Sequence, residues 1–499
     1  MKITARQGSL TDASCDVLVV NLFEGVKTPG GGTGAVDKAL NNLISSYVIE
    51  KEEFKGKLNQ MYVLHTYGKI PADKILIVGL GKSEDFSLNK IREISSKVIK
   101  KVKSLKAKKV CTILHGAGTA GLEDYSCARM IAEGAIIGNY SFDKYKTKDK
   151  EEKEDKKEIE TLEIVELDSS KLESINKGIE TGKIIAEAVN FARNLINEPA
   201  CVATPTKLAE TALSIQGIEC KVLEKDEVEK MGMGSFLAVG RGSSEPPKFI
   251  HMKYTPSASA RKKLAIVGKG VTFDSGGLDI KPADSMRMMK EDMSGAAATI
   301  GIMNAITQLK PDVEIHGIIA ACENMPGSKA YKPGDVLTAM NGKTIEVDNT
   351  DAEGRLTLAD ALYYASEQNV DEIIDIATLT GACMVALGYM AAGIMGNDEQ
   401  LIKNLIDAAD KGGERFWQLP MYDEHKEELK SVIADMKNCG SRYGGASTAG
   451  RFLQEFTDEK KWAHIDIAGT AWIDKEIKEL SKGPTGSGVR AILNYILSL

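Results

Sequence analysis

Acidic side chains gather in two short segments of this 499-residue sequence, each directly after an apolar run. Asp274 and Asp292 lie in the first segment, and Asp351 and Glu353 lie in the second. Carboxylates that converge in a fold repel one another unless a cation offsets their charge. Oxygen ligands suit divalent metals, and bridging carboxylates suit two ions about 3.5–4 Å apart. The pattern therefore predicts a metal site that can deprotonate water, although spacing alone does not identify the reaction.

Basic side chains accompany these carboxylates. Lys269 and Lys281 flank Asp274 in the chain, and Arg355 follows Glu353 by two positions. In an extended segment, residues two apart share a face, so we expect Asp351, Glu353 and Arg355 to point the same way. Lys281 and Arg355 would then supply positive charge to a developing oxyanion. Each residue taken alone also fits an ordinary loop or capping position.

Three other segments imitate catalytic motifs but do not complete them. Residues 79–83 look like part of a phosphate-binding loop, but Leu76 stands where that motif requires glycine. The glycine-rich stretch 30–40 can bind phosphate through backbone amides, yet a simple turn before a helix is the favoured interpretation. Ser275 follows Phe273 instead of the glycine of a nucleophile elbow. The six histidines form no HExxH motif, so a metal needs other ligands.

The elements that must position the carboxylates alternate between strands and helices. In the first region, apolar runs predict strands and helical spacing predicts helices, which together indicate an α/β domain. The predicted strands are 15–23, 74–81, 109–118 and 162–167, and the predicted helices are 89–105 and 127–140. Residues 143–160 are almost entirely charged and predict a solvated loop or exposed helix, with partner binding as the less favoured alternative.

A long amphipathic helix at 175–199 is expected to connect this region to a second α/β region. Apolar strands are predicted there at 263–270, 313–322, 372–379 and 462–468. Residues 335–349 predict a hairpin, in which Asn341 and Gly342 suit a type I′ turn. Continuous apolar strands with intervening helices imply a sheet covered on both faces. Ligands in such folds bind beyond the carboxyl ends of the strands, where both acidic segments are expected.

Length and composition limit the alternatives. A chain of 499 residues with 43% hydrophobic and 27% charged residues is expected to form two to four globular domains. The net charge of −7 argues against nucleic acid as the main ligand. No apolar run is long enough for a transmembrane helix, and the polar start does not resemble a secretory signal. The eight scattered cysteines indicate reduced thiols, so a cytoplasmic protein is expected.

The segment NTDAEGRL at 349–356 is similar to the signature octapeptide of the leucyl aminopeptidase, or cytosol aminopeptidase, family. Further segments that resemble this family of dinuclear metallo-aminopeptidases are 268–282, 288–298, 374–382, 462–472 and 483–490. The resemblance implies an N-terminal macro-like α/β domain at 1–168 and a connecting helix at 169–198. It also implies an α/β catalytic domain at 199–499, with a mixed, mostly parallel sheet covered by helices.

The same resemblance assigns residues to roles. It implies that two divalent ions, zinc or manganese, are bound by Lys269, Asp274, Asp292, Asp351 and Glu353, with Asp274 and Glu353 touching both ions. A lysine ligand requires a depressed pKa, which two adjacent cations can produce. Arg355 would hold a bicarbonate that acts as general base, and Lys281 would polarise the scissile carbonyl. Met289, Thr378 and Gly381 match positions that line the pocket for the first side chain of the substrate, although core packing explains them equally well.

By resemblance, the chain hydrolyses the N-terminal residue of peptides, prefers apolar residues such as leucine, and uses a metal-bridging hydroxide. The family assembles as homohexamers, and no membrane association is implied. Two alternatives remain open at this point. One is an additional DNA-binding or regulatory role, for which the lysine-rich stretch 89–110 is the best candidate surface. The other is an inactive scaffold, against which the complete set of ligands argues.

Overall fold

The computed structural model describes residues 1–116, 121–147 and 158–499. Most of the charged stretch that predicts a solvated loop or exposed helix lies outside the described residues, at 148–157. No helix among the described residues is both long enough and apolar enough to span a membrane.

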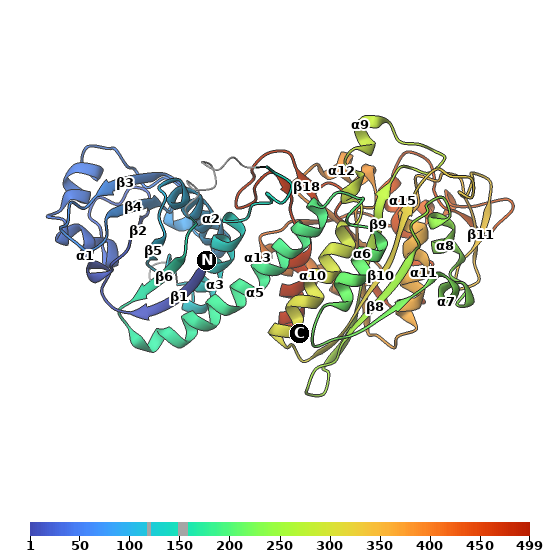
Figure 1. The fold of residues 1–499 in the computed structure, drawn as a ribbon, viewed down its shortest axis with the longest axis horizontal. Coiled ribbons are helices and arrows are strands. Elements are labelled where there is room, and N and C mark those ends of the chain that lie inside the picture. Colours follow the sequence, from blue (N-terminus) through green and yellow to red (C-terminus); the bar gives the residue numbers. More distant parts are fainter. Residues whose placement is uncertain (117–120, 148–157) are drawn as a thin grey trace. The chain divides into compact units, whose positions relative to one another are not determined.

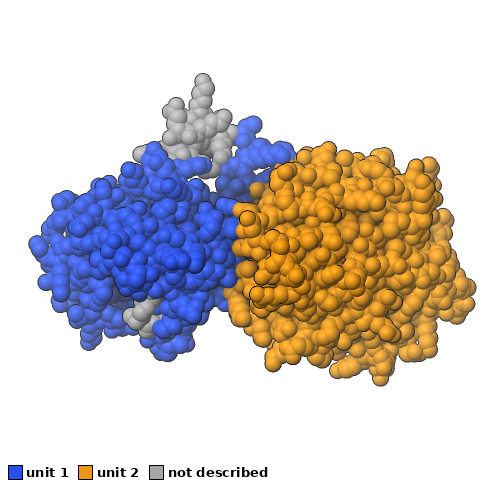
Figure 2. Space-filling view, turned by 90° about the horizontal axis from the view of Figure 1, so that it is seen from below, with its two compact units in different colours: residues 1–187, 476–481 blue, residues 188–475, 482–499 orange. Residues whose placement is uncertain are grey.

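The chain forms two compact units, which are coloured separately in Figure 2. Unit 1 contains residues 1–187 and also the short segment 476–481. Unit 2 contains residues 188–475 and 482–499. Unit 1 is therefore not one continuous stretch of sequence, because a segment near the end of the chain returns to it.

Unit 1 is built on a six-stranded sheet of order β1-β6-β5-β2-β4-β3, in which the edge strand β3 alone runs antiparallel to its neighbour (Figure 1). Its strands are β1 Lys2–Gln7, β2 Val17–Leu22, β3 Met61–His65, β4 Lys74–Gly79, β5 Lys109–Thr112 and β6 Thr161–Glu166. Its helices are α1 Gly31–Ala39, α2 Leu88–Ser104 and α3 Asp124–Gly138, and α5 Leu172–Asn197 continues into unit 2. The carboxyl ends of β1, β6, β5 and β2 therefore meet at one edge.

Alternating residues of the central strands fill two separate cores in unit 1. Val17 and Val19 of β2 pack with residues of α2 and α3 on one face of the sheet. Leu18 and Val20 pack with residues of α1 on the opposite face. Successive side chains of a strand point to opposite faces, so continuous apolar runs are what a sheet covered on both sides requires.

Unit 2 is built on an eight-stranded sheet of order β15-β14-β17-β13-β9-β10-β8-β7. Its strands are β7 Glu219–Leu223, β8 Lys248–Tyr254, β9 Lys262–Asp274, β10 Val313–Asn324, β13 Glu372–Ala377, β14 Ala392–Gly396, β15 Phe416–Gln418 and β17 Lys461–Asp466. The central strands β17, β13, β9 and β10 are parallel, whereas β14 and β8 run antiparallel to their inner neighbours. This mixed, mostly parallel sheet confirms the predicted α/β class.

Helices cover both faces of this sheet. Ala265 and Val267 of β9 pack with residues of α8 and α11, whereas α10 packs against β9, β10 and β13. The helices of unit 2 after α5 are α6 Pro205–Leu213, α7 Lys225–Lys230, α8 Gly234–Gly240, α9 Ala283–Met286, α10 Ser294–Leu309, α11 Gly354–Ser366, α12 Gly381–Leu387, α13 Glu399–Gly412, α14 Glu424–Glu427, α15 Gly445–Gln454 and α16 Val489–Ser498. Two small sheets complete the unit, formed by β11 Val336–Thr338, β12 Thr344–Glu346 and β16 Met436–Lys437, and by β18 Trp472–Ile473 and β19 Gly483–Pro484.

The predicted hairpin is confirmed, but its predicted turn type is wrong. Strands β11 and β12 pair antiparallel around the expected turn. Gly342 has a φ of +85°, whereas Asn341 is not among the residues with positive φ, so the pair does not form a type I′ turn. The Asn341 side chain accepts a hydrogen bond from the backbone N–H of Lys343 at 3.1 Å. This local bond suits an asparagine that keeps a negative φ and leaves the left-handed position to glycine.

Candidate metal centre

Three carboxylates come together at the carboxyl edge of the unit 2 sheet. Asp274 is the last residue of β9, Asp351 lies in the loop after β12, and Glu353 directly precedes α11. One oxygen from each carboxylate lies within 4.8 Å of the other two. Asp274 and Glu353 are buried, with exposed fractions of 2% and 1%. The group therefore has the size and the oxygen-rich character of a divalent-metal site.

A fourth carboxylate, that of Asp292, is connected to this group through Lys269. The Nζ atom of Lys269 lies 2.7 Å from Asp292 Oδ1 and 2.8 Å from Glu353 Oε1. Thr378 supports the pair, because its hydroxyl donates to Asp292 Oδ1 at 2.8 Å and its carbonyl accepts from Lys269 at 3.0 Å. All five residues predicted as metal ligands therefore lie together. Ion pairs join Lys269 to Asp292 and Glu353. The carboxylates of Asp274 and Asp351 lie close to that of Glu353.

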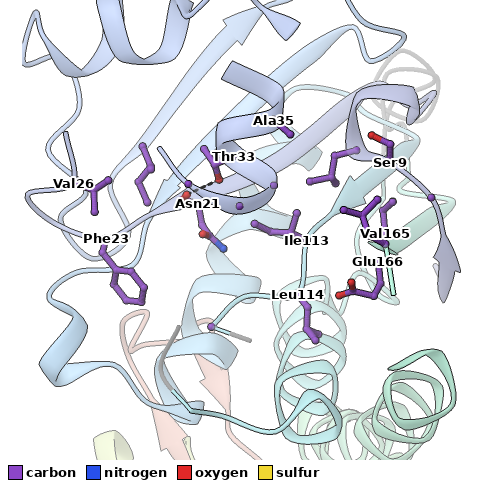
Figure 3. Close-up of a pocket in the computed structure, with 18 of the residues that line it drawn as sticks. Ser9, Asn21, Phe23, Val26, Thr33, Ala35, Ile113, Leu114, Val165 and Glu166 are labelled. Atoms are coloured by element: carbon purple, nitrogen blue, oxygen red, sulfur yellow. Dashed lines mark hydrogen bonds between the residues drawn. The ribbon is translucent and has the colours of Figure 1, made fainter. Parts of the chain in front are cut away.

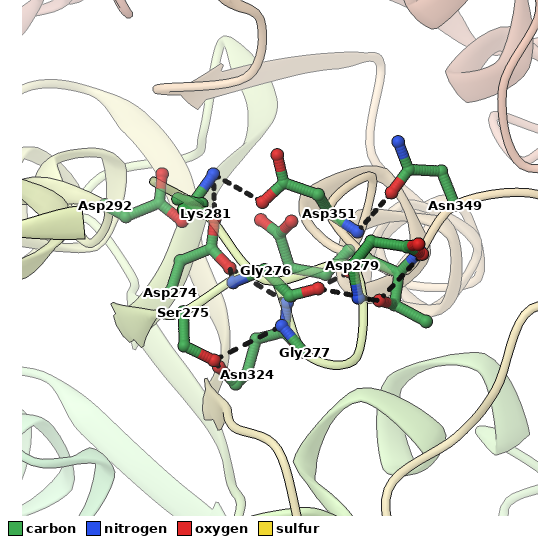
Figure 4. Close-up of polar contacts among 12 residues, drawn as sticks. Asp274, Ser275, Gly276, Gly277, Asp279, Lys281, Asp292, Asn324, Asn349 and Asp351 are labelled. Atoms are coloured by element: carbon green, nitrogen blue, oxygen red, sulfur yellow. Dashed lines mark hydrogen bonds and ion pairs between the residues drawn. The ribbon is translucent and has the colours of Figure 1, made fainter. Parts of the chain in front are cut away.

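Lys281 also lies among the carboxylates, where it pairs with Asp274 and Asp351 (Figure 4). Its Nζ atom is 2.8 Å from Asp274 Oδ2 and 2.5 Å from Asp351 Oδ1. The two lysine ammonium groups offset only half of the charge of the four carboxylates. With all four carboxylates ionised, the cluster therefore keeps an excess of two negative charges, which one divalent cation would neutralise.

The pKa values of the carboxylates also show that negative charge is in excess at this site. Burial, reinforced by the charge of Glu353, raises the pKa of Asp274 to about 6. Burial also raises the pKa of Asp292 well above its ordinary value, although the ammonium of Lys269 opposes this. Burial raises the pKa of Asp351 as well. Each of these shifts means that the ionised form is held at a cost in free energy, which a bound cation would remove.

The buried polar atoms near the cluster that have no hydrogen-bond partner among the described residues include one from Asp292 and one from Arg355. Asp292 Oδ2 is an acceptor without a donor, and Arg355 Nε is a donor without an acceptor. An unsatisfied buried group costs about 1–3 kcal/mol. A cation at Asp292 and an anion at Arg355 would satisfy them, so the residues fit the metal ions and the bicarbonate that the resemblance implies.

Arg355 does not reach the site in the predicted way. Helix α11 begins at Gly354, and Glu353 already has helical backbone angles of −77° and −36°. Residues two apart do not share a face in a helix, so the expected shared face is wrong for Glu353 and Arg355. The carboxylates of Asp351 and Glu353 do converge, as expected. Arg355 lies in the first helical turn, and its Nη1 donates to the carbonyl of Asn438 at 2.9 Å.

The residues predicted to line the substrate pocket lie around the same strand ends. Met289 belongs to a single 3₁₀ turn just before Asp292. Thr378 directly follows β13, and its hydroxyl is used to support Asp292. Gly381 opens α12, and a Cβ atom at this position would meet no atom within 4 Å. Open space at Gly381 is compatible with a substrate side chain, whereas the contacts of Thr378 also give it a supporting role.

Sequence reasoning missed the polar residues that support the carboxylates. Asn324 and Thr350 are fully buried and bond to each other and to the ligand segments. The side chain of Asn438 donates to the carbonyl of Asn349 at 2.6 Å and holds the loop before Asp351. Asn324 ends β10 at the same edge as Asp274, which would have been a usable signal if the strand had been predicted two residues longer.

The motif imitations have structural roles. The Ser275 hydroxyl donates to the carbonyl of Asn324 at 2.8 Å, which ties adjacent strand ends together and does not match a nucleophile beside a base. The lysine-rich stretch of α2 is partly neutralised within unit 1, because Lys97 and Lys100 both form ion pairs with Glu476. Neither feature therefore supports a rival activity.

Unit 1 has a cavity of its own, of about 540 Å³, at the carboxyl ends of its parallel strands (Figure 3). Its walls are mainly apolar and include Phe23 and Ile113. The glycine-rich start of α1 forms another wall, and no side chain caps the first turn of this helix. Thr33, a buried polar residue of the wall, uses its hydroxyl to donate to the carbonyl of Asn21 at 2.8 Å. The phosphate-binding alternative for this loop stays a prediction.

Both parts of the chain match models of one protein family. The model of the cytosol aminopeptidase family, catalytic domain, matches residues 190–493, and that of the family's N-terminal domain matches residues 19–149. A protein of Aquifex aeolicus named "Probable cytosol aminopeptidase" is 49% identical over 91% of this chain and 90% of its own length. Another of that name, from Alkaliphilus oremlandii, is 44% identical over 100% of both chains.

Solved structures agree with this assignment. A mutant of tomato leucine aminopeptidase superposes with a TM-score of 0.88 at 36% identity, covering 100% of this chain and 97% of its own. The bottromycin maturation enzyme BotP in complex with Mn gives a TM-score of 0.85 at 31% identity, covering 97% of this chain and 99% of its own. Fold, site and matches define a metal-dependent hydrolase that removes residues from the N-terminus of peptides. The chain belongs to the cytosol aminopeptidase family, as its motifs predict.

Proposed function

We propose that the chain is a dinuclear metallo-aminopeptidase that removes apolar N-terminal residues, such as leucine, from peptides. The observation that supports this proposal is the largely buried cluster of four carboxylates whose charge is only half offset by Lys269 and Lys281. The proposed metal ligands are Lys269, Asp274, Asp292, Asp351 and Glu353. Zinc and manganese are the proposed ions, and the similarity to a protein solved in complex with Mn favours manganese as one that this site accepts.

When bound, the two ions would supply Lewis-acid chemistry, which lowers the pKa of water and polarises the scissile carbonyl. Lys269 must then act as a neutral ligand. Burial alone would lower the pKa of Lys269, but the charges of Asp292 and Glu353 raise it above the ordinary value. The amine becomes available when metal charge replaces the charge of the ammonium group, so loading of the site is expected to release a proton.

Lys281 is proposed to pair with carboxylates in the metal-free site and to act as a hydrogen-bond donor to the substrate in the loaded site. Its ammonium group is held between Asp274 and Asp351 at 2.8 and 2.5 Å. Metal ions would compete for the same two carboxylates, which frees Lys281 to donate to the carbonyl oxygen as negative charge develops there. A donor aimed at the developing charge stabilises the transition state more than the substrate.

Arg355 is proposed to hold bicarbonate as the general base. Its guanidinium is buried and oriented by the Asn438 carbonyl, and its Nε is free to bind an anion. A base held there by Arg355 would take a proton from the nucleophile and return it to the leaving amine, which is the relay that peptide hydrolysis needs. Arg355 itself stays charged throughout.

Selection of the first side chain is proposed to depend on Met289, Thr378 and Gly381. The open space at Gly381 leaves room for a branched apolar side chain, and Met289 offers a flexible apolar surface. We also propose a homohexamer that acts in the cytoplasm on peptide substrates, in keeping with the family. Light scattering of the purified chain tests the assembly, and a monomer at micromolar concentration would contradict it.

Removal of Glu353 tests the metal site most directly. The Glu353→Ala variant is expected to lose at least one of two bound ions and to lose activity by several orders of magnitude, because Glu353 lies within reach of Asp274, Asp351 and Lys269. Metal content per chain is measured by elemental analysis after dialysis, together with turnover of an aminoacyl substrate. A variant that keeps both ions and full activity would remove Glu353 from the ligand set.

A further inference from the structure

A buried amide lies behind the carboxylate cluster. Asn324 is the last residue of β10, and none of its surface is exposed. Its Nδ2 atom donates two hydrogen bonds, to Asp274 Oδ1 at 2.8 Å and to the carbonyl of Thr350 at 3.0 Å. Because Thr350 directly precedes Asp351, this one amide connects both segments that carry the proposed ligands (Figure 4).

The contacts of Asp274 make its two oxygens unequal. Asp274 Oδ1 accepts from Asn324 and also from the backbone N–H of Gly276 at 2.9 Å. A carboxylate oxygen has two lone pairs, so these donors saturate Oδ1. Asp274 Oδ2 is contacted by the ammonium of Lys281. Oδ2 is therefore the atom of Asp274 that remains available to a cation.

The orientation of the Asn324 amide is fixed by this arrangement. Its Oδ1 atom is buried and has no hydrogen-bond partner among the residues that the structure describes. Reversing the amide would turn that oxygen toward the Asp274 carboxylate and the Thr350 carbonyl, which are both acceptors, and would lose two hydrogen bonds. An unsatisfied buried acceptor costs free energy, and an apolar side chain of similar size would avoid that cost. The amide is therefore poorly explained by packing alone.

The backbone around Asn324 is also adapted to it. A Cβ atom at Gly277 would lie 2.9 Å from Asn324 Oδ1, and Gly277 has a φ of +66°, so glycine is required on both counts. The Asn324 carbonyl accepts from both the backbone N–H and the hydroxyl of Ser275, at 2.9 and 2.8 Å. Asn324 thus lies at fixed distances from the strand end and from the loop that follows it.

We propose that Asn324 is a positioning residue for the metal centre. It holds the Asp274 carboxylate so that Oδ2 alone faces the ions, and any contact of Asp274 with both ions passes through that single oxygen. Through the Thr350 carbonyl it also sets the separation between Asp274 and Asp351. This inference rests on the proposed metal site and assigns a role to a residue outside the ligand set.

The test is the Asn324→Leu variant of the full chain, which keeps the size of the side chain but removes both donors. Co²⁺ is the probe, because its visible absorption reports coordination geometry and its affinity can be measured by competition with a chelator. Residues that orient metal ligands typically contribute about 10–100-fold to affinity. We expect Co²⁺ affinity to fall by that factor and the absorption bands to change, in a metal-free variant that still unfolds cooperatively although the lost donor lowers its melting temperature.

Ser275→Ala is the matched control. It removes the hydroxyl's bond to the Asn324 carbonyl and its bond from the backbone N–H of Gly277 but leaves the amide in place, so Co²⁺ affinity should stay within about twofold of the parent. Tyr331→Phe separates the two halves of the proposal, since Tyr331 donates to the Thr350 carbonyl at 2.7 Å. Its expected loss of affinity is smaller than that of Asn324→Leu, and an equal loss would overturn the role of the amide at Asp274.

Unchanged affinity and an unchanged Co²⁺ spectrum in folded Asn324→Leu would overturn the inference. If that variant does not fold, Asn324→Ala is measured in the same way and with the same expected loss. The result remains distinguishable from failure of the proposed function. If Glu353→Ala keeps both ions, the metal site itself is wrong, whereas loss of metal in Glu353→Ala with no effect at Asn324 overturns only the positioning role.

Discussion

The two units place polar groups at equivalent edges of their sheets, yet they differ in how those groups are satisfied. In unit 2, three buried carboxylates and the half-buried carboxylate of Asp351 share two ammonium groups, and Asp292 Oδ2 has no partner among the described residues. In unit 1, the cavity at the strand ends has mainly apolar walls, and its buried Thr33 is hydrogen-bonded within the chain. A location beyond the carboxyl ends of strands therefore allows a ligand site in either unit. Unsatisfied buried charge indicates which unit carries the catalytic site.

The largest loss of activity that would test this difference between the units is expected from substitution of Lys281. Lys281→Ala should retain both metal ions, because it removes a cation that competes for Asp274 and Asp351. Turnover should fall about 10²–10³-fold, as for loss of one donor to a developing oxyanion. Metal content and turnover of the same preparation check this. Near-normal turnover would remove Lys281 from the mechanism and would weaken the distinction between the units.

A pH effect is expected in unit 1 from a buried base. Burial lowers the pKa of His115 to about 4, while the unfolded chain has the ordinary value near 6.5. Below pH 6.5 the unfolded state therefore binds a proton at His115, whereas the folded state stays unprotonated there until the pH approaches 4. The free energy of unfolding therefore decreases as the pH falls toward 4. The loss amounts to about 3 kcal/mol when complete.

Hydrogen exchange of unit 1 peptides at pH 7 and pH 4.5, with and without His115→Gln, measures this dependence. The variant should lose less protection on acidification than the parent chain. Equal losses in both would show that His115 is not the group responsible.

Removal of metal should act on unit 2 and not on unit 1. An ion present at 100 times its Kd stabilises the folded state by about 2.7 kcal/mol, and a chelator removes that contribution. Exchange protection should decrease in β9, which ends at Asp274, and in α11, which directly follows Glu353. It should be unchanged in β2 and β4. A decrease of the same size in unit 1 would mean that metal binds there too.

The smallest expected effect compares two glycines at helix starts. Gly381 and Gly30 both lie where a Cβ atom would meet nothing within 4 Å. Gly381→Leu should lower kcat/KM for a leucyl substrate by about 10–200-fold, because the side chain fills the proposed pocket. An alanyl substrate should lose less. Gly30→Leu, which narrows the unit 1 cavity, is the control and should leave kcat/KM within twofold for both substrates.

Much of the architecture could be predicted because the sheet strands are continuous apolar runs. The strands around Val17, Ile75 and Ile374 were found for this reason. Strands β1 and β3 were missed because they lie at sheet edges and contain exposed and half-buried residues, which breaks the apolar pattern. Edge strands need only one neighbour and one buried face, so their sequences carry a weaker signal.

The site was predicted less completely than the fold. The acidic pattern pointed to Asp274, Asp292, Asp351 and Glu353, and the resemblance added Lys269 to the ligand set. Spacing also gave Arg355 a shared face with Glu353, which the start of α11 does not allow. Asn324 was missed because it lies two residues beyond the predicted end of its strand. Its contact with Asp274 also depends on the register between β9 and β10, which pairs the two residues and is fixed only in the folded sheet.

The return of residues 476–481 to unit 1 has a consequence for synthesis. Within unit 1, Glu476 pairs with Lys97 and Lys100, and the Glu479 carbonyl accepts from Ser96. A ribosome makes this segment nearly 300 residues after residue 187, on the order of 15–60 s later at about 5–20 residues per second. The first unit to begin leaving the ribosome thus completes its contacts only after most of unit 2 has been made, and Lys97 and Lys100 cannot pair with Glu476 until then.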